Sequence, residues 1–188
     1  MTFTIQSIVK DSNKMIEIGK LAAKYHPENF NHFENRIDSY HDFFIVYKDN
    51  EPLAISGIYR YKEWFPNLYR IADRSFYFPI NRDKSLGYLG GITEKTILSH
   101  LLIPKQTQIV IDMGGIPFYS MLRHKNALKR STERNNEISK NKYVVLDDLY
   151  FTCPFNPDNN DRCWQYIAAL KQHRELFNDK TLRHGKNT

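Results

Sequence analysis

The chain of 188 residues contains little cysteine, since Cys153 and Cys163 are its two examples. They stand ten residues apart, with no Cys-x-x-Cys pattern and no histidine at a ligand spacing. This excludes a disulfide framework and argues against a zinc site. We interpret both cysteines as packing residues. The histidines show no His-x-x-x-His spacing and no glutamate partner, so no metal site is expected.

Long apolar runs are also missing. The longest run is about 43–47, whereas a membrane helix needs about 20 apolar residues. The first residues, Met-Thr-Phe-Thr-Ile, lack the basic start and apolar stretch of a signal peptide. We therefore expect a cytoplasmic protein without membrane contact.

Aromatic residues are plentiful, with 12 Tyr, 12 Phe and 2 Trp. Aromatic side chains bury much area each, so they offset a modest aliphatic content. The length fits a single domain with a sizeable core. We expect this domain over residues 1–176, followed by a polar tail over 177–188.

The net charge is +6, and it is unevenly distributed. Residues 1–114 hold 14 basic and 13 acidic residues, and residues 115–188 hold 13 basic and 8 acidic ones. The C-terminal part therefore carries +5 of the total. Such an excess indicates either a solvated basic surface or contact with an anionic partner, such as nucleic acid or a nucleotide cofactor.

Hydrophobic periodicity predicts alternating strands and helices. The expected strands are 2–8, 43–47, 53–61, 69–78, 107–112 and 143–151. The expected helices are 14–25, 30–40, 93–102, 116–130 and 162–176. This order predicts an α+β fold, with a central, mostly antiparallel mixed sheet and helices on both faces.

A basic loop with several glycines lies between the expected strand 69–78 and the helix that follows. Its cationic and glycine residues are Arg82, Lys84, Gly87, Gly90 and Gly91. Backbone N–H groups and cations ahead of a helix N-terminus are suited to phosphate binding. The alternative is an ordinary surface loop, because a glycine loop alone is a weak signal.

This order of elements resembles the GNAT N-acyltransferase family. The hairpin 46–57 is similar to the second and third strands of the family, with a small residue after the turn. The segment 69–78 is similar to the fourth strand, 82–91 to the pyrophosphate loop, 107–112 to the fifth strand and 116–130 to the helix after it. The chain also resembles uncharacterised GNAT-like proteins of tailed phages, which would place it in the host cytoplasm.

The resemblance implies acetyl-CoA or another acyl-CoA as cofactor and an amine as acceptor. In the family, backbone groups of the fourth strand contact the acyl-CoA, which here are those of Phe76, Tyr77 and Phe78. The loop cations and glycines would bind the pyrophosphate, and Asn126 would approach the cofactor from the helix.

Two residues are candidates for acid–base chemistry. Asp73 lies in the middle of an expected strand, where a carboxylate is costly unless paired, and we consider it as general base. The alternative is a salt bridge with Arg74 or Arg70. Tyr119 falls where the family often has an acid, and its alternative is core packing.

The densest basic run supplies a second interpretation. Arg123, Lys125, Lys129 and Arg130 could contact nucleic acid, although a helix does not put all of them on one face. The sequence therefore leaves two functions open. One is an acyl-CoA-dependent N-acyltransferase. The other is a non-catalytic GNAT-like phage accessory module that binds nucleic acid or a host protein through its basic C-terminal part.

Overall fold

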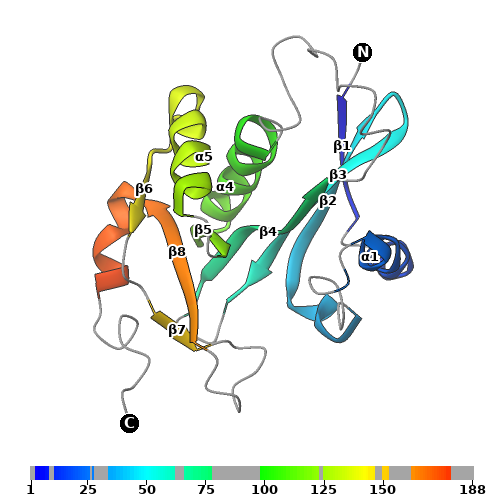
Figure 1. Ribbon diagram of the computed structural model, residues 1–188, viewed down its shortest axis with the longest axis horizontal. Coiled ribbons are helices and arrows are strands. Elements are labelled where there is room, and N and C mark those ends of the chain that lie inside the picture. The colour runs from blue at the N-terminus through cyan, green and yellow to red at the C-terminus, as the bar shows by residue number, and fades with distance from the viewer. Residues whose placement is uncertain are drawn as a thin grey trace.

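The computed structural model describes residues 3–8, 11–25, 27, 34–61, 66–77, 98–122, 125–146, 150–152 and 162–178. Figure 1 shows a twisted sheet with helices packed against it. Among the described helices, none is both long and apolar enough to cross a lipid bilayer.

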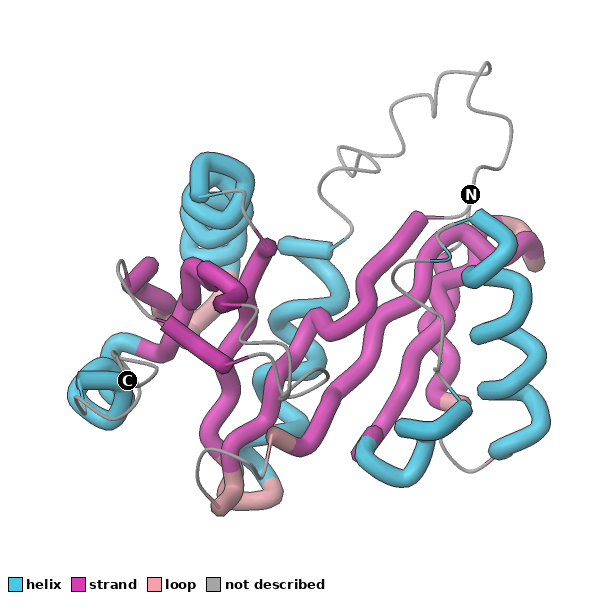
Figure 2. The backbone as a smooth tube through the Cα atoms, turned by 60° about the horizontal axis from the view of Figure 1, so that its bottom comes forward, coloured by secondary structure: helices cyan, strands magenta, loops and turns pink. Residues whose placement is uncertain are grey.

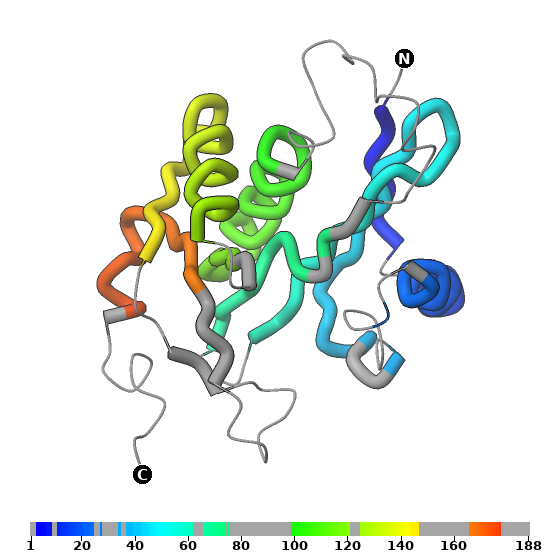
Figure 3. Tube along the Cα trace, viewed as in Figure 1, coloured from blue at the N-terminus to red at the C-terminus, as the bar shows by residue number. Residues whose placement is uncertain are grey.

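The sheet runs in the order β1-β2-β3-β4-β5-β8-β6, and β7 pairs with the other end of β8. Its N-terminal half comprises β1 (Phe3–Ser7), β2 (Tyr40–Lys48), β3 (Glu51–Arg60) and β4 (Leu68–Tyr77), and neighbouring strands there are antiparallel. Its C-terminal half comprises β5 (Ile116–Leu122), β6 (Tyr143–Leu146), β7 (Tyr150–Thr152) and β8 (Arg162–Leu170). The colours of Figure 3 show that each half of the chain builds one half of the sheet.

Helices cover both faces of this sheet (Figure 2). On one face, α1 (Ser12–Tyr25) and the 3-10 helices η1 (Glu34–Ser39) and η4 (Lys171–Asn178) enclose a core that includes Met15, Tyr40 and Phe118. On the other face, α4 (Ile103–Asp112) and α5 (Lys125–Ile138) enclose a core that includes Ile71, Val110 and Leu128. The expected α+β class, with a mostly antiparallel mixed sheet between helices, is confirmed.

The parallel pair at the centre of the sheet is short. β4 and β5 pair at Leu68–Ile116, Tyr69–Pro117 and Arg70–Phe118, and at no later position within the two described strands. Beyond this point β4 remains on β3, while β5 remains on β8. The two strands therefore part after Arg70, and α4 contacts both of them (Figure 1).

The predictions between residues 98 and 130 were wrong in detail. The segment 107–112, predicted as the fifth strand, lies in α4, and the fifth strand is β5. Pro104 stands in the first turn of α4, which begins directly after the π-helical turn η2 (Leu98–Leu102). Proline is tolerated there since first-turn N–H groups have no helical partner. Residues 116–122 are strand, so the next helix begins at Lys125.

The C-terminal prediction was also partly wrong. The segment 162–176, predicted as a helix, is the strand β8 followed by η4. Ile167 and Ala169 face one core while Ala168 and Leu170 face the other, which is the alternation of a strand covered on both sides. The expected strand 143–151 is β6 and the start of β7, separated by 147–149. Phe177, the first residue of the predicted tail, is fully buried.

Candidate active site

The strand β4 is irregular directly after it leaves β5. The three steps along β4 from Arg70 to Asp73 lie opposite two steps along β3, from Tyr59 to Gly57, and the same happens between Asp73 and Phe76. Within the first of these two spans, Ala72 has a φ of 53°, which is in the left-handed region that residues with a Cβ rarely adopt. β4 therefore carries a bulge where its partner strand departs.

Asp73 points from this bulge toward the α1 face of the sheet. The Tyr40 hydroxyl donates a hydrogen bond of 2.6 Å to its Oδ2 atom, and Arg70 Nε lies 3.3 Å from its Oδ1 atom. Asp73 and Arg70 are 4% and 8% exposed, so the ion pair is nearly buried. The salt bridge to Arg70, one of the alternatives drawn from the sequence, is thus present. A buried carboxylate needs such partners.

Gly57 makes the contact with Tyr40 feasible. It pairs with Asp73 across β3 and β4, and a Cβ atom at Gly57 would lie 2.6 Å from Tyr40 Cε1 and 2.7 Å from Phe43 Cδ2. Because real Cβ atoms do not approach carbon atoms so closely, only glycine fits beneath these rings. The tyrosine ring therefore reaches the carboxylate directly over the glycine.

The opposite side of the bulge is held by side chains from α4 and β3. The Ala72 N–H donates to Gln106 Oε1 at 2.7 Å, and the Ser75 hydroxyl donates to the Ala72 carbonyl at 2.8 Å. Ser56 Oγ lies 2.7 Å from Ser75 Oγ and 3.1 Å from Gln106 Nε2. Ser56 and Gln106 are fully buried.

Tyr119 was predicted on a helix, but it lies in β5 with its side chain against α5. Its hydroxyl lies 2.8 Å from Thr132 Oγ1, which donates to the Leu128 carbonyl, so the Tyr119 hydroxyl donates to Thr132. Its ring meets that of Tyr143 edge-on at 4.9 Å. Burial raises the pKa of Tyr119 well above its ordinary value. These contacts fit the packing alternative, and the predicted acid role stays a prediction.

The other predicted site residues are only partly described. The backbones of Phe76 and Tyr77 belong to β4, and Asn126 lies exposed in the first turn of α5. Lys125, Lys129 and Arg130 are exposed on α5, and the Lys125 ammonium lies 5.7 Å from the centroid of the Tyr166 ring. Outside the described residues lie Phe78, Arg82, Lys84, Gly87, Gly90, Gly91 and Arg123.

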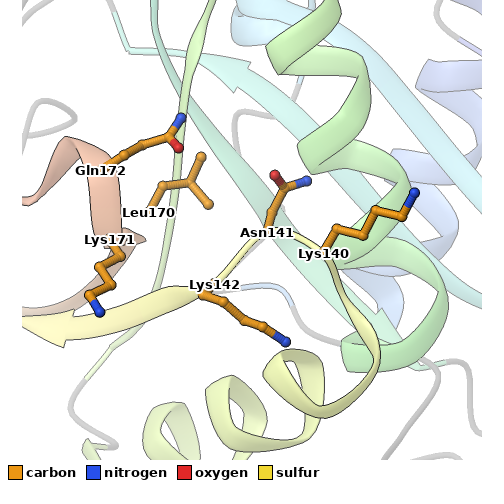
Figure 4. Close-up of a pocket in the computed structure, with 6 residues that line it drawn as sticks. All are labelled: Lys140, Asn141, Lys142, Leu170, Lys171 and Gln172. Carbon is orange, nitrogen blue, oxygen red and sulfur yellow. The ribbon is translucent and has the colours of Figure 1, made fainter.

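A pocket of about 380 Å³ lies elsewhere, where the α5–β6 turn meets the end of β8 (Figure 4). It is lined by Lys140, Asn141, Lys142, Leu170, Lys171 and Gln172. Figure 4 shows that the three ammonium groups point away from one another, and one of them, on Lys142, donates to the Asn136 carbonyl. The pocket therefore does not gather positive charge at one point, and the β4 bulge is the better candidate site.

Five residues at the bulge were missed from the sequence: Tyr40, Ser56, Gly57, Ser75 and Gln106. Tyr40 and Gln106 have partners 33 and 34 residues away in the chain, so no local pattern could connect them. The short hairpin with a small residue was noted at Gly57, but not its contact with Tyr40. Asp73 alone carried a signal, because a carboxylate in an apolar strand requires an explanation.

Neither a protein-family model nor a curated protein sequence matches the chain. Solved structures do match it. Aminoglycoside acetyltransferase AAC(6')-Ib, in complex with acetyl-CoA and paromomycin, aligns over 100% of both chains at 12% identity with a TM-score of 0.54. Its complex with coenzyme A and kanamycin covers 94% of this chain and 99% of its own, at 11% identity and a TM-score of 0.53.

A protein from Bacteroides thetaiotaomicron, assigned to the GNAT family of acetyltransferases, covers 96% of each chain at 12% identity with a TM-score of 0.51. At such identities the likeness concerns the fold and not the activity. Together with the strand order and the parting of β4 from β5, it shows that this chain has the fold of the GNAT acetyltransferases.

Proposed function

We propose that the protein is an acyl-CoA-dependent N-acyltransferase, which transfers an acyl group, in the simplest case acetyl, to an amine. The observation that carries the proposal is the bulge in β4 at the point where β4 and β5 part, with the Asp73 carboxylate beside it. After Arg70 the described part of β4 is not paired with β5, so backbone polar groups on that edge can bind a ligand. The fold likeness to acetyltransferases supports the same conclusion.

In this proposal, the backbone of β4 binds the thioester and Asp73 binds the amine. Backbone N–H groups around Phe76 and Tyr77 bind the thioester carbonyl and stabilise the developing oxyanion. The amine nitrogen attacks the carbonyl carbon and loses one proton to Asp73, the proposed general base. The carbon–sulfur bond breaks, and the thiolate of CoA takes up a proton from water. Asp73 accepts a hydrogen bond from the amine, because each oxygen of its carboxylate has a further lone pair beyond those used by Tyr40 and Arg70.

The remaining assignments are also proposals. The cations Arg82 and Lys84, with the N–H groups of Gly87, Gly90 and Gly91, bind the pyrophosphate, and Asn126 approaches the cofactor from α5. Tyr119 could supply the proton for the thiolate only if its bond to Thr132 opened. The resemblance to phage proteins and the cytoplasmic location stay predictions.

Thermal unfolding with acetyl-CoA and with CoA tests the proposal. A ligand present at 100 times its dissociation constant adds about 2.7 kcal/mol to the free energy of unfolding, which raises Tm by about 5–10 °C for a chain of this size. An unchanged Tm at millimolar concentrations of both ligands contradicts the proposal. Adenosine serves as a control, because it lacks the phosphates and the thioester.

Variants of the basic loop test the pyrophosphate assignment. Losing a charge-assisted contact costs about 1.5–3 kcal/mol, so Arg82→Ala and Lys84→Ala should each weaken CoA binding about 10- to 100-fold. Lys171→Ala is the matched control, since Lys171 is an exposed lysine that lines the pocket beside β6. Equal affinity in all three variants shows that the loop does not bind the phosphates.

The alternative function rests on the outer face of α5. Lys125, Lys129 and Arg130 are exposed there, whereas Leu128, Ser131, Thr132 and Asn135 face the core. We propose nucleic acid as the partner of this face if CoA does not bind. Anisotropy titrations with labelled DNA and RNA should then show affinity that falls linearly in log salt, with a smaller slope after all three cations are replaced by alanine.

A further inference from the structure

The bulge at Ala72 requires stabilisation from outside β4. A residue with a Cβ in the left-handed region costs about 1–2 kcal/mol, and such a conformation persists only when surrounding groups fix it. β5 does not fix it, because its pairing with β4 ends at Arg70. The Ala72 N–H and carbonyl groups must therefore find other partners.

Both partners are side chains, and they form a closed ring of hydrogen bonds. The Ala72 carbonyl accepts from Ser75, so the single hydrogen of the Ser75 hydroxyl is used. Ser56 must then donate to Ser75, and Gln106 Nε2 must donate to Ser56. Gln106 Oε1 accepts from the Ala72 N–H, which closes the ring.

Gln106 is the one member of this ring that comes from outside the sheet. It is fully buried in α4 and occupies the place that a neighbouring strand would take beside Ala72. A buried amide that is bonded through both its oxygen and its nitrogen fixes one arrangement, whereas an apolar residue would leave the Ala72 N–H without a partner. A regular β4 strand would not need the Gln106 amide. This indicates that Gln106 stabilises the bulge.

We propose that Gln106 is a positioning residue of the acyl-CoA site. By accepting the hydrogen bond from the Ala72 N–H, Gln106 fixes the path of the β4 backbone toward Phe76 and Tyr77, which are the proposed contacts of the thioester carbonyl. Through the same hydrogen bond it sets the direction of Asp73, which follows Ala72 and points to the opposite face. The inference rests on the proposed function for its ligand, but the hold of Gln106 on Ala72 is measurable without any ligand.

The test compares four forms of the full chain: wild type, Gln106→Leu, Gln106→Glu and Gln108→Leu. Leucine removes both polar atoms at similar size. Glutamate keeps the acceptor for the Ala72 N–H and loses the donor to Ser56. Gln108 is the control, since it is an exposed residue of the same helix that bonds Asp112. Calorimetric titration with acetyl-CoA and with CoA gives the affinities, and amide hydrogen exchange followed by NMR reports on the Ala72 N–H.

We expect Gln106→Leu to weaken acetyl-CoA binding by at least about tenfold, and CoA binding by less, because CoA lacks the thioester carbonyl that is proposed to meet β4 at Phe76 and Tyr77. Gln106→Glu and Gln108→Leu should remain within about threefold of wild type. The Ala72 amide should exchange at least about tenfold faster in Gln106→Leu alone. Should Gln106→Leu not fold, Ser75→Ala takes its place in the affinity measurements. It removes the two ring bonds of the Ser75 hydroxyl, and acetyl-CoA binding should again weaken more than CoA binding.

A folded Gln106→Leu variant with wild-type affinity for acetyl-CoA overturns the positioning role, as does an unchanged exchange rate at Ala72. A wild-type protein that binds neither ligand contradicts the proposed function and thereby this role in the acyl-CoA site. The exchange measurement distinguishes the two failures, because it tests the contact between Gln106 and Ala72 independently of the ligand.

Discussion

The Tyr40 hydroxyl donates a 2.6 Å hydrogen bond to the Asp73 carboxylate, across the backbone of Gly57. The two residues belong to β2 and β4, which are separated in the sheet by β3. A side chain reaches over an intervening strand only where that strand has no side chain of its own, and this is the role of Gly57. The buried carboxylate beside the bulge therefore depends on residues from three strands.

Replacing Tyr40 by phenylalanine should reduce the free energy of unfolding by about 1.5–3 kcal/mol, because a buried carboxylate loses a hydrogen bond. Urea denaturation measures this loss. A cycle with Asp73→Asn isolates the contact, and the effects of the two substitutions should be non-additive. Additive losses would show that the hydroxyl and the carboxylate do not interact in solution.

Replacing Gly57 by alanine should destabilise the protein by about 1–3 kcal/mol, since the new methyl group would overlap the Tyr40 and Phe43 rings. Gly114 provides the contrast. It has a φ of 74° but open space around its Cα, so Gly114→Asn should be nearly neutral, because asparagine tolerates this conformation. Similar melting temperatures for wild type and Gly57→Ala would contradict the close packing.

Replacing Phe177 by alanine should cost about 3–5 kcal/mol, as for a large core side chain. Phe177 is fully buried, and its ring lies 6.0 Å from that of Phe118. Its neighbour Leu176 is 46% exposed, and Leu176→Ala should change stability by no more than about 0.5 kcal/mol. Equal effects in thermal unfolding would mean that η4 does not pack on the sheet as described.

Alkaline pH should destabilise the protein through two buried tyrosines. Burial raises the pKa of Tyr119 and of Tyr143 above the ordinary value near 10. Since the folded state holds these protons more tightly, their contribution is complete below about pH 10 and is lost as the pH rises further. The free energy of unfolding should fall by up to about 1.4 kcal/mol per pH unit for each tyrosine.

Urea denaturation at pH values from about 8 to about 11 would measure this slope, because tyrosine ionises in roughly this range. Tyr143→Phe should reduce the slope, although it also leaves the Thr107 hydroxyl without its partner and lowers stability at neutral pH. A slope that is the same in wild type and in Tyr143→Phe would indicate that this tyrosine ionises freely.

The sequence predicted the N-terminal half of the fold well. The helix expected over 14–25 and the strands expected over 43–47, 53–61 and 69–78 all occur, with small shifts at their ends. These segments have clear local signals, namely helical spacing of apolar residues in α1 and β-branched or aromatic runs around the turn at Asp49 and Asn50. Both turn residues have positive φ values, which asparagine and aspartate tolerate.

The same kind of signal was misleading at 107–112 and 162–170. Thr107–Asp112 is rich in β-branched residues, yet it is helical because its buried residues pack across β4 and β5. Arg162–Leu170 has an apolar pattern that suits a helix, yet it is a strand whose residues 167–169 lie between β5 and β6 with both faces covered. A short apolar run fits either state, and the neighbours decide which one forms.

Composition and local pattern thus determined the class of fold and singled out Asp73, because an uncompensated carboxylate in an apolar strand is unfavourable whatever surrounds it. Only the tertiary structure decided which groups compensate it and where β4 parts from β5. Tyr40, Gly57 and Gln106 meet the bulge from separate elements, and hydrogen bonds between residues more than 30 positions apart leave no trace in local periodicity. The physical reason is that register and bulges depend on contacts between strands, which a single strand does not specify.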